Sequence, residues 1–243
     1  MKGIGEKKIV FRGHGSLSTA IDRRELVGAM PERARRVFLL SPADASGARA
    51  RLLLNGASQL ELAVRLRNGG APLGEVFAFA SSLYFRGKLA YAQRFAAAPD
   101  GVPGVLVITV SRGLLRPDTV LSAAEMEEMT RGEVHHENEN YLAPLVRDAR
   151  RLHKQLNGSV EVVLLGSIAT PKYVKPLLEI FGEQLMFPAE FVGIGDMSRG
   201  GLLLKSFREG VELKYVRILG AKLSTAGAKR TQVESAKARQ KAS

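Results

Sequence analysis

The sequence predicts one α/β domain with a mostly parallel central sheet, helices on both faces, a C-terminal β-hairpin and a disordered basic tail. Short apolar runs that end in Ser, Pro or Gly alternate with segments of helical periodicity. The chain has 243 residues, of which 45% are hydrophobic, so one sizeable core can form. Beyond Gly220 the sequence is too polar to pack. We therefore expect a domain over residues 1–220 and a tail over residues 221–243.

The strands are predicted from apolar runs of four to six residues, the usual length of a strand that is buried on both faces. Each run stops at a residue that favours turns, such as Ser41 or Gly166. The predicted strands are a short one within residues 7–16, then Arg36–Leu40, Val105–Val110 and Val160–Leu165.

The helices are predicted from apolar residues three and four positions apart. Ser122 and Glu125 have the spacing of a capping box at the start of a helix, and Gly182 is predicted to end the helix that precedes it. The stretch from Asn68 to Gly74 is predicted to be a loop from its turn-forming residues. The predicted helices are Ser18–Met30, Ala48–Leu54, Leu60–Leu66, one that ends at Phe95 after a break at Ser81–Ser82, one that follows Ser122, Pro144–Leu156 and Tyr173–Phe181.

The hairpin is predicted from two alternating runs on either side of Arg208-Glu209-Gly210. Before it comes Gly193–Gly201, which holds four glycines, one acid and one base. Backbone amides of such a loop can approach an anion, with Gly195, Asp196, Ser198 and Arg199 close to it. The segment matches neither a Walker motif nor GxGxxG. It is either a phosphate or substrate site or a structural loop before the hairpin.

The composition excludes several classes of site. Cysteine is absent, so disulfides, thiolate nucleophiles and cysteine-ligated metals are excluded, and a reducing cytoplasm suits the chain. No apolar run is long enough to cross a bilayer, and the first residues lack the apolar core of a signal peptide. We expect a soluble cytoplasmic protein with no membrane partner and no cofactor.

The formal charge is +12 and the isoelectric point is near 10.2. The stretch from Lys222 onward contributes six basic residues and one acid, a net +5, and leaves +7 for the preceding chain. A basic body with a basic tail favours a nucleic acid or nucleotide partner. Solubility alone is the alternative explanation.

Three predicted strands end in small polar or basic clusters. These clusters are Ser41-Pro42-Ala43-Asp44, Ser111-Arg112-Gly113 and Gly166-Ser167. Ligands of open α/β sheets bind beyond the carboxyl ends of the strands, so we expect the three clusters to converge on a cleft. The alternative is that these residues only form turns.

A further candidate lies at the start of the helix that ends at Phe95. Ser81 and Ser82 place two hydroxyls there, and Tyr84, Arg86 and Lys88 follow. A helix amino terminus with hydroxyls and a guanidinium group suits a phosphate. A capped helix with a solvated basic face would have the same sequence.

Carboxylates that could act as a general base are Asp44, Asp118 and Asp196, and we favour Asp44 and Asp196. A single water-activating carboxylate suits hydrolysis of an N-glycosidic bond and needs no metal. His135 and His136 lie among glutamates, but the chain lacks the HExxH spacing and adjacent residues seldom share one metal. We therefore expect no metal site. The chain lacks the GxSxG motif, so the sequence does not support serine-hydrolase chemistry.

Three runs carry a resemblance to known proteins: SSLYFRGKLAYA, VLVITVSRGLLRPDT and VVLLGSIATPKYVKPLL. They resemble a family of bacterial and phage α/β proteins, and the order of elements from Val37 to Leu204 is similar to the uracil-DNA-glycosylase-like domain of archaeosine synthases. The resemblance implies a role on nucleobases or nucleic acid. The chain lacks the water-activating motif and the His-Pro-Ser loop of uracil-DNA glycosylases, and Ser41–Asp44 and Gly193–Gly201 stand in their places.

Three functions are compatible with these observations. The first is an enzyme that acts on a nucleobase or nucleotide, with Asp44 or Asp196 as acid/base and Arg86, Arg112 or Arg199 on phosphate. The second is a non-catalytic nucleic-acid-binding protein that uses its basic body and tail. The third is a small-molecule enzyme of the nucleotide-sugar type.

Overall fold

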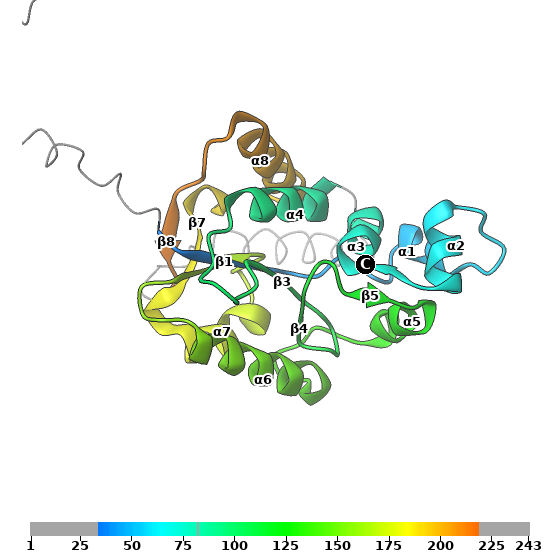
Figure 1. Cartoon of the computed structure of the whole chain (residues 1–243), viewed down its shortest axis with the longest axis horizontal. Coiled ribbons are helices and arrows are strands. Elements are labelled where there is room, and N and C mark those ends of the chain that lie inside the picture. Colours follow the sequence, from blue (N-terminus) through cyan, green and yellow to red (C-terminus); the bar gives the residue numbers. More distant parts are fainter. Residues whose placement is uncertain (1–33, 82, 219–243) are drawn as a thin grey trace, which may run out of the picture. The chain divides into compact units, whose positions relative to one another are not determined.

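The computed structural model describes residues 34–81 and 83–218 (Figure 1). The strand and helix predicted before Arg33, the tail predicted after Gly220, and Ser82 lie outside the described residues. In chain order the elements are β1 (Arg36–Leu40), α1 (Ala48–Leu54), α2 (Glu61–Asn68), β2 (Ala71–Pro72), α3 (Leu73–Ser81), α4 (Leu83–Phe95), β3 (Val105–Ile108), β4 (Leu114–Leu115), β5 (Val120–Leu121), α5 (Ala123–Arg131), α6 (Glu139–Gln155), β6 (Glu161–Leu165), α7 (Pro171–Phe181), β7 (Leu185–Pro188), α8 (Asp196–Glu209) and β8 (Tyr215–Arg217).

The main sheet has the strand order β4-β3-β1-β6-β7-β8. Strand β1 pairs in parallel with β3 on one side and with β6 on the other, and β6 pairs in parallel with β7. The two edge strands, β4 and β8, are antiparallel to their neighbours. The predicted α/β class and the mostly parallel sheet are confirmed.

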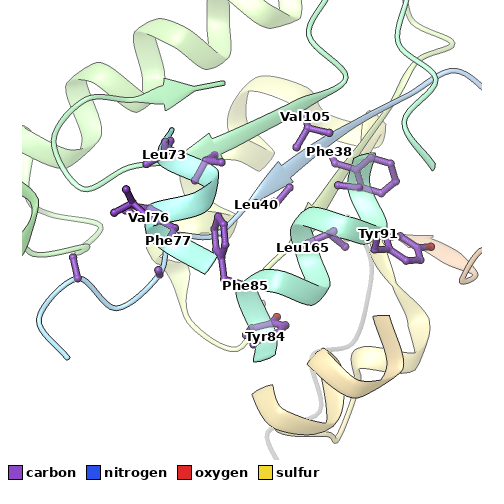
Figure 2. Close-up of a cluster of buried hydrophobic side chains, with 14 of the residues drawn as sticks. Phe38, Leu40, Leu73, Val76, Phe77, Tyr84, Phe85, Tyr91, Val105 and Leu165 are labelled. Carbon is purple, nitrogen blue, oxygen red and sulfur yellow. The ribbon is translucent and has the colours of Figure 1, made fainter. Parts of the chain in front are cut away.

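Helices cover both faces of this sheet, and β1 shows why. Phe38 and Leu40 belong to the core under α3, α4 and α8, whereas Val37 and Leu39 belong to the core under α6 and α7. All four side chains are fully buried. Figure 1 shows these helices on opposite sides of the strands, and Figure 2 shows Phe38 and Leu40 in the first core. Burial on both faces explains the unbroken apolar run in the sequence.

Helices α4 and α8 make the most extensive helix–helix contact among the described elements. Two glycines allow their backbones to meet. A Cβ atom at Gly87 would lie 2.8 Å from the carbonyl oxygen of Gly200, and one at Gly200 would lie 2.9 Å from the Cα of Tyr84. Real Cβ atoms do not approach backbone so closely, so the crossing requires glycine at both positions.

A buried polar network joins the amino end of β1 to the C-terminal strand. The Arg36 guanidinium forms ion pairs with Glu161 and with Glu212, and it lies 4.5 Å from the ring centroid of Tyr215. The hydroxyl of Tyr91 accepts a hydrogen bond of 2.9 Å from the backbone N–H of Leu213. The two ion pairs neutralise the Arg36 charge, which would be costly to bury alone.

The C-terminal β-hairpin was predicted at the wrong residues. The antiparallel pair consists of β7 and β8, and the run Leu202–Phe207, predicted as its first arm, lies inside α8. Gly210 does form a turn, with a φ of 69°, but as the C-cap of this helix. The run LLLKSF is compatible with the alternation of a strand and with the spacing of a helix. Packing of Leu203 against α4 favours the helix.

Other boundaries differ by less. The capping box at Ser122 and the helix stop at Gly182 are present as predicted. Helix α6 starts at Glu139, before the predicted Pro144, because Asn138 caps it through the N–H of Asn140. The predicted loop before α3 contains β2, which pairs with β5. Within the described residues, no helix has the length and apolarity that are needed to cross a membrane.

We expect Gly200→Ala to destabilise the protein by roughly 1–3 kcal/mol, because the added methyl group would force α4 and α8 apart. Gly201→Ala is the matched control, since a Cβ at this neighbouring position meets nothing within 4 Å. In the control, better helix propensity should add about 0.5–1 kcal/mol of stability. Urea unfolding of both variants measures the difference, and equal stability would contradict the close crossing.

Candidate functional site

A cavity of about 380 Å³ opens at the carboxyl edge of the sheet. Its residues come from the loop after β1, the end of α3, the start of α4, the loop after β3, α5 with the loop after it, the loop after β6, and the starts of α7 and α8. The lining residues are Ser41, Pro42, Ala43, Asp44, Ala45, Ser46, Ser81, Tyr84, Val110, Met129, Thr130, Gly132, Val134, Ser167, Lys172, Tyr173 and Asp196.

The sheet topology explains why the cavity lies there. From β1 the chain passes to β3 on one side, and it then crosses to β6 on the other side. The loops that leave the carboxyl ends of β1 and its neighbours therefore diverge, which leaves a crevice at this switch point. Ser41, Val110 and Ser167 follow these three strands and line the cavity.

Ser41 connects the sheet to the cavity. Its N–H donates to the carbonyl of Leu165, which continues the pairing of β1 with β6 by one residue. The Nζ of Lys88 on α4 lies 2.8 Å from the Ser41 hydroxyl and 2.6 Å from its carbonyl oxygen. Across the strand, a Cβ at Gly166 would lie 3.0 Å from the Cβ of Ser41. Gly166 thus leaves space for Ser41 and is not part of the cavity wall.

Asp44 is held in a local turn. The backbone N–H and the hydroxyl of Ser46 both donate to its Oδ1, at 2.9 and 2.7 Å. The side-chain and backbone hydrogen bonds from Ser46 hold the pKa of Asp44 below its usual value. The carboxylate is therefore ionised at neutral pH, so it can accept a proton or stabilise a cation but cannot act as an acid.

The α4–α8 crossing brings Tyr84 and Asp196 to the same cavity. Tyr84 is only 8% exposed, and its hydroxyl lacks a hydrogen-bond partner among the described residues. Burial raises the pKa of Tyr84 to about 12. The positive charge of Arg199 acts to lower this pKa, and the negative charge of Asp196 acts to raise it. An unpaired buried hydroxyl is costly, which makes it a good receptor for a polar group of a ligand.

Lys172 and Tyr173 bring a second aromatic ring and a cation from the first turn of α7. Tyr173 is 5% exposed, and burial raises its pKa. The Nζ of Lys172 lies 5.1 Å from the centroid of the Tyr173 ring. Pro171, at the first position of α7, starts this helix directly after the β6 loop.

Six of the predicted site residues line the cavity: Ser41, Asp44, Ser81, Tyr84, Ser167 and Asp196. They come from segments that are far apart in the sequence. Ser41, Asp44 and Ser167 reach one edge because they follow the parallel strands β1 and β6, and helices α3, α4 and α8 bring Ser81, Tyr84 and Asp196 to the same edge.

The cluster after β3 was predicted to join the cleft but lies outside the cavity lining. The Ser111 hydroxyl donates to Glu128 at 2.9 Å, and Arg112 forms an ion pair with Glu125. Both acids lie on α5, so these pairs hold α5 against the β3 loop. Val110, one residue earlier, faces the cavity in their place.

The remaining predicted residues have other positions. Arg86 and Ser198 are exposed and do not line the cavity, and Gly195 is the N-cap of α8. Arg199 donates from its guanidinium to the carbonyl oxygen of Phe191 at 3.1 Å, and it pairs with Asp196 at 3.3 Å. The segment predicted as a glycine-rich loop is therefore largely the first turn of a helix.

Ser46, Lys172 and Tyr173 were not predicted as site residues, and Lys88 was predicted only within the candidate phosphate site at the start of α4 or on a solvated basic face. The placement of Lys-Tyr just after the β6 loop could have indicated Lys172 and Tyr173, because helix starts that follow parallel strands face the same edge. Burial of Lys88 has no sequence signal, since it depends on the packing of α4 against β1.

The loop before α6 contains a further group of potential ligands. Donor atoms of His135, His136 and Glu137 lie within 4.8 Å of one another. The Glu137 side chain is 78% exposed. The group is outside the cavity lining, and exposed clusters of this kind are common without a metal.

Comparison of the chain with protein-family models, with curated proteins and with solved structures found no match. Functional inference therefore depends on the chemistry of the cavity itself.

We expect Ser46→Ala to raise the pKa of Asp44, because the substitution removes the hydroxyl hydrogen bond and leaves the backbone one. A lowered pKa stabilises the folded state above the pKa of the unfolded chain, and this stabilisation is lost as the pH falls through the folded-state pKa. The variant should lose less stability on acidification. Carboxyl ¹³C chemical shifts measure the pKa, and Ser159→Ala, far from Asp44 in the sequence, serves as the control. An unchanged pKa would contradict the turn geometry.

Proposed function

We propose that the cavity binds a nucleobase or nucleotide and that the protein hydrolyses an N-glycosidic bond, with nucleic acid as the substrate class. One observation carries the proposal. Two buried tyrosines and two acids, Asp44 and Asp196, line a single cavity of about 380 Å³. Sites for small ligands occupy about 300–1,000 Å³ and combine apolar walls with a few polar groups.

The two tyrosines suit a planar heterocycle. Tyr84 and Tyr173 provide aromatic surface, and the unpartnered Tyr84 hydroxyl can exchange a hydrogen bond with the edge of a base. Lys172, at the start of α7, provides a positive charge for a phosphate.

Asp44 is the carboxylate that we assign to the reaction, because it lines the cavity and Ser46 holds it in place. Ser46 keeps it ionised, so it can remove a proton from water while the water oxygen attacks the anomeric carbon. The carbon–nitrogen bond breaks as the new carbon–oxygen bond forms, and the departing base takes a proton from solvent. Asp196 is a second negative charge that would stabilise an oxocarbenium-like transition state.

The resemblance to the uracil-DNA-glycosylase-like domain of archaeosine synthases favours the same substrate class. The resemblance places Ser41–Asp44 and Gly193–Gly201 at about the motif positions of those proteins, and Ser41, Asp44 and Asp196 line the cavity.

Asp44→Asn and Asp196→Asn should each reduce base release by about 10²–10⁴-fold if the acid acts in proton transfer or charge stabilisation. Asp118→Asn is the matched control, because Asp118 pairs with Arg116 at the surface and is not part of the cavity lining. The assay uses the full chain with single-stranded DNA, duplex DNA and RNA, and it separates released bases by chromatography. Equal release by the wild type and both cavity variants would rule out the mechanism.

A non-catalytic nucleic-acid-binding protein is the second candidate, and the distribution of charge favours it. Residues 34–218 contain 23 Lys and Arg against 19 Asp and Glu, a net +4 of the total +12. Two thirds of the excess charge therefore belongs to residues 1–33 and 219–243. Phosphate neutralisation by such charges needs no catalytic cavity.

A variant of the full chain separates these candidates. In this variant Gln replaces all six Lys and Arg residues from Lys222 to the end of the sequence. A binder that depends on these charges should lose affinity and should show a shallower dependence on salt, because fewer counterions are released. If the cleft recognises a base, the variant should still bind the same nucleic acid in preference to the others. Fluorescence anisotropy at low and moderate salt measures both quantities.

A further inference from the structure

Lys88 is a buried cation that the proposed hydrolysis does not use. Its side chain is 1% exposed and ranks among the largest fully buried groups of the described residues. Burial of an ammonium group is costly unless a carboxylate pairs with it. No described carboxylate lies within ion-pair distance of Nζ, whose hydrogen-bond partners are the hydroxyl and the carbonyl oxygen of Ser41.

Burial favours the neutral form of Lys88, whereas the aromatic rings and the Ser41 oxygens around Nζ favour its protonated form. The rings of Tyr84 and Phe85 lie 4.5 and 5.1 Å from Nζ. Burial lowers the pKa of Lys88 to about 7, and the charge of Asp196 on α8 opposes this shift. Strand β3 has no titratable side chain, Arg36 lies at the far end of β1, and Glu75 on α3 pairs with Arg65.

A neutral amine at 2.8 Å from a hydroxyl can accept its proton. The ammonium form donates to both oxygens of Ser41; in the neutral amine one hydrogen can still donate to the carbonyl while the nitrogen accepts from the hydroxyl. Ser41 is buried and is one of the residues that line the cavity, beside the space that a substrate would occupy. Ser–Lys pairs of this kind are one of the recognised variants of serine nucleophile activation.

We propose that Ser41 is a nucleophile and Lys88 its general base, and that the cavity forms an acyl-enzyme with carboxylic esters. This activity goes beyond the hydrolysis of N-glycosidic bonds and does not depend on it. The missing GxSxG motif does not oppose the proposal, because that motif belongs to a different geometry, with histidine as the base.

The reaction balances with the residues present and water. The Ser41 proton passes to Lys88 Nζ as Oγ bonds to the acyl carbon, and the carbon–oxygen bond to the alcohol breaks as the alkoxide takes the proton from Lys88. Water then attacks the acyl carbon, gives its proton to Lys88, and releases the acid as Oγ recovers that proton. The Ser167 hydroxyl and Lys172 line the same cavity and can donate to the developing oxyanion.

The test treats the full chain with p-nitrophenyl acetate and with diisopropyl fluorophosphate, followed by intact-mass measurement and peptide mapping. We expect one adduct, on Ser41, whose rate of formation increases as the pH rises through about 7. Ser41→Ala should form no adduct, and Lys88→Met should react at least about 100-fold more slowly. Ser159→Ala and Lys205→Met, which change the same residue types outside the cavity lining, should react like the wild type.

Several results would overturn the proposal. These are an unmodified wild type, an adduct on another residue, or equal rates for Lys88→Met and the wild type. Thermal melting checks that Lys88→Met is folded. If this variant does not fold, the pH profile of wild-type labelling decides, because a rate that is independent of pH between 6 and 8 excludes a base that titrates near 7. Base release from nucleic acid is measured separately, so failure of either activity leaves the other interpretable.

Discussion

The position of β1 at the centre of the sheet is the constraint on which the rest of the molecule depends. Its side chains are buried on both faces, and its backbone pairs in parallel with β3 and β6. Because the chain continues on one side of β1 and then on the other, the loops diverge at its carboxyl end. The same strand therefore joins the two hydrophobic cores and fixes the location of the cavity, while Arg36 anchors its opposite end.

The α4–α8 crossing adds the second requirement. Without side chains at Gly87 and Gly200, the two helices approach until backbone meets backbone. Tyr84 and Lys88 lie on one of these helices and Asp196 begins the other, so the close packing of the two helices positions an aromatic ring, a buried amine and an acid together. Packing of this density transmits small changes in helix position directly to the cavity.

The cavity contains two chemical systems that share one edge of the sheet. Asp44 is exposed, and its hydrogen-bond partner Ser46 is two residues away in the sequence and keeps it anionic. Lys88 is buried, is bonded to Ser41, and is shifted by burial towards its neutral form. Burial lowers the pKa of Lys88 to about 7, which makes its neutral form available, whereas the hydrogen bonds from Ser46 lower the pKa of Asp44 and keep it anionic. Functional sites commonly contain titratable groups that are perturbed in this way.

Part of the site was accessible from local sequence. Polar residues that follow buried strands predicted Ser41, Asp44 and Ser167, because strand direction alone decides which edge they reach. Ser111 and Arg112 satisfy the same rule but pair with glutamates of α5. A sequence cannot indicate that difference, since the partners are 13 to 17 residues away and their choice depends on how α5 docks.

The sequence by itself determined the α/β class, the central strands, most helices and the caps at Ser122 and Gly182, because hydrophobic period and capping are properties of neighbouring residues. Only the tertiary structure decided that Leu202–Phe207 is helical, that Arg199 bonds to the Phe191 carbonyl, and that Lys88 is buried beneath Ser41. These outcomes depend on contacts between segments distant in the chain. Packing energy there exceeds local preference, and burial changes the charge state of a side chain whose sequence neighbours are unremarkable.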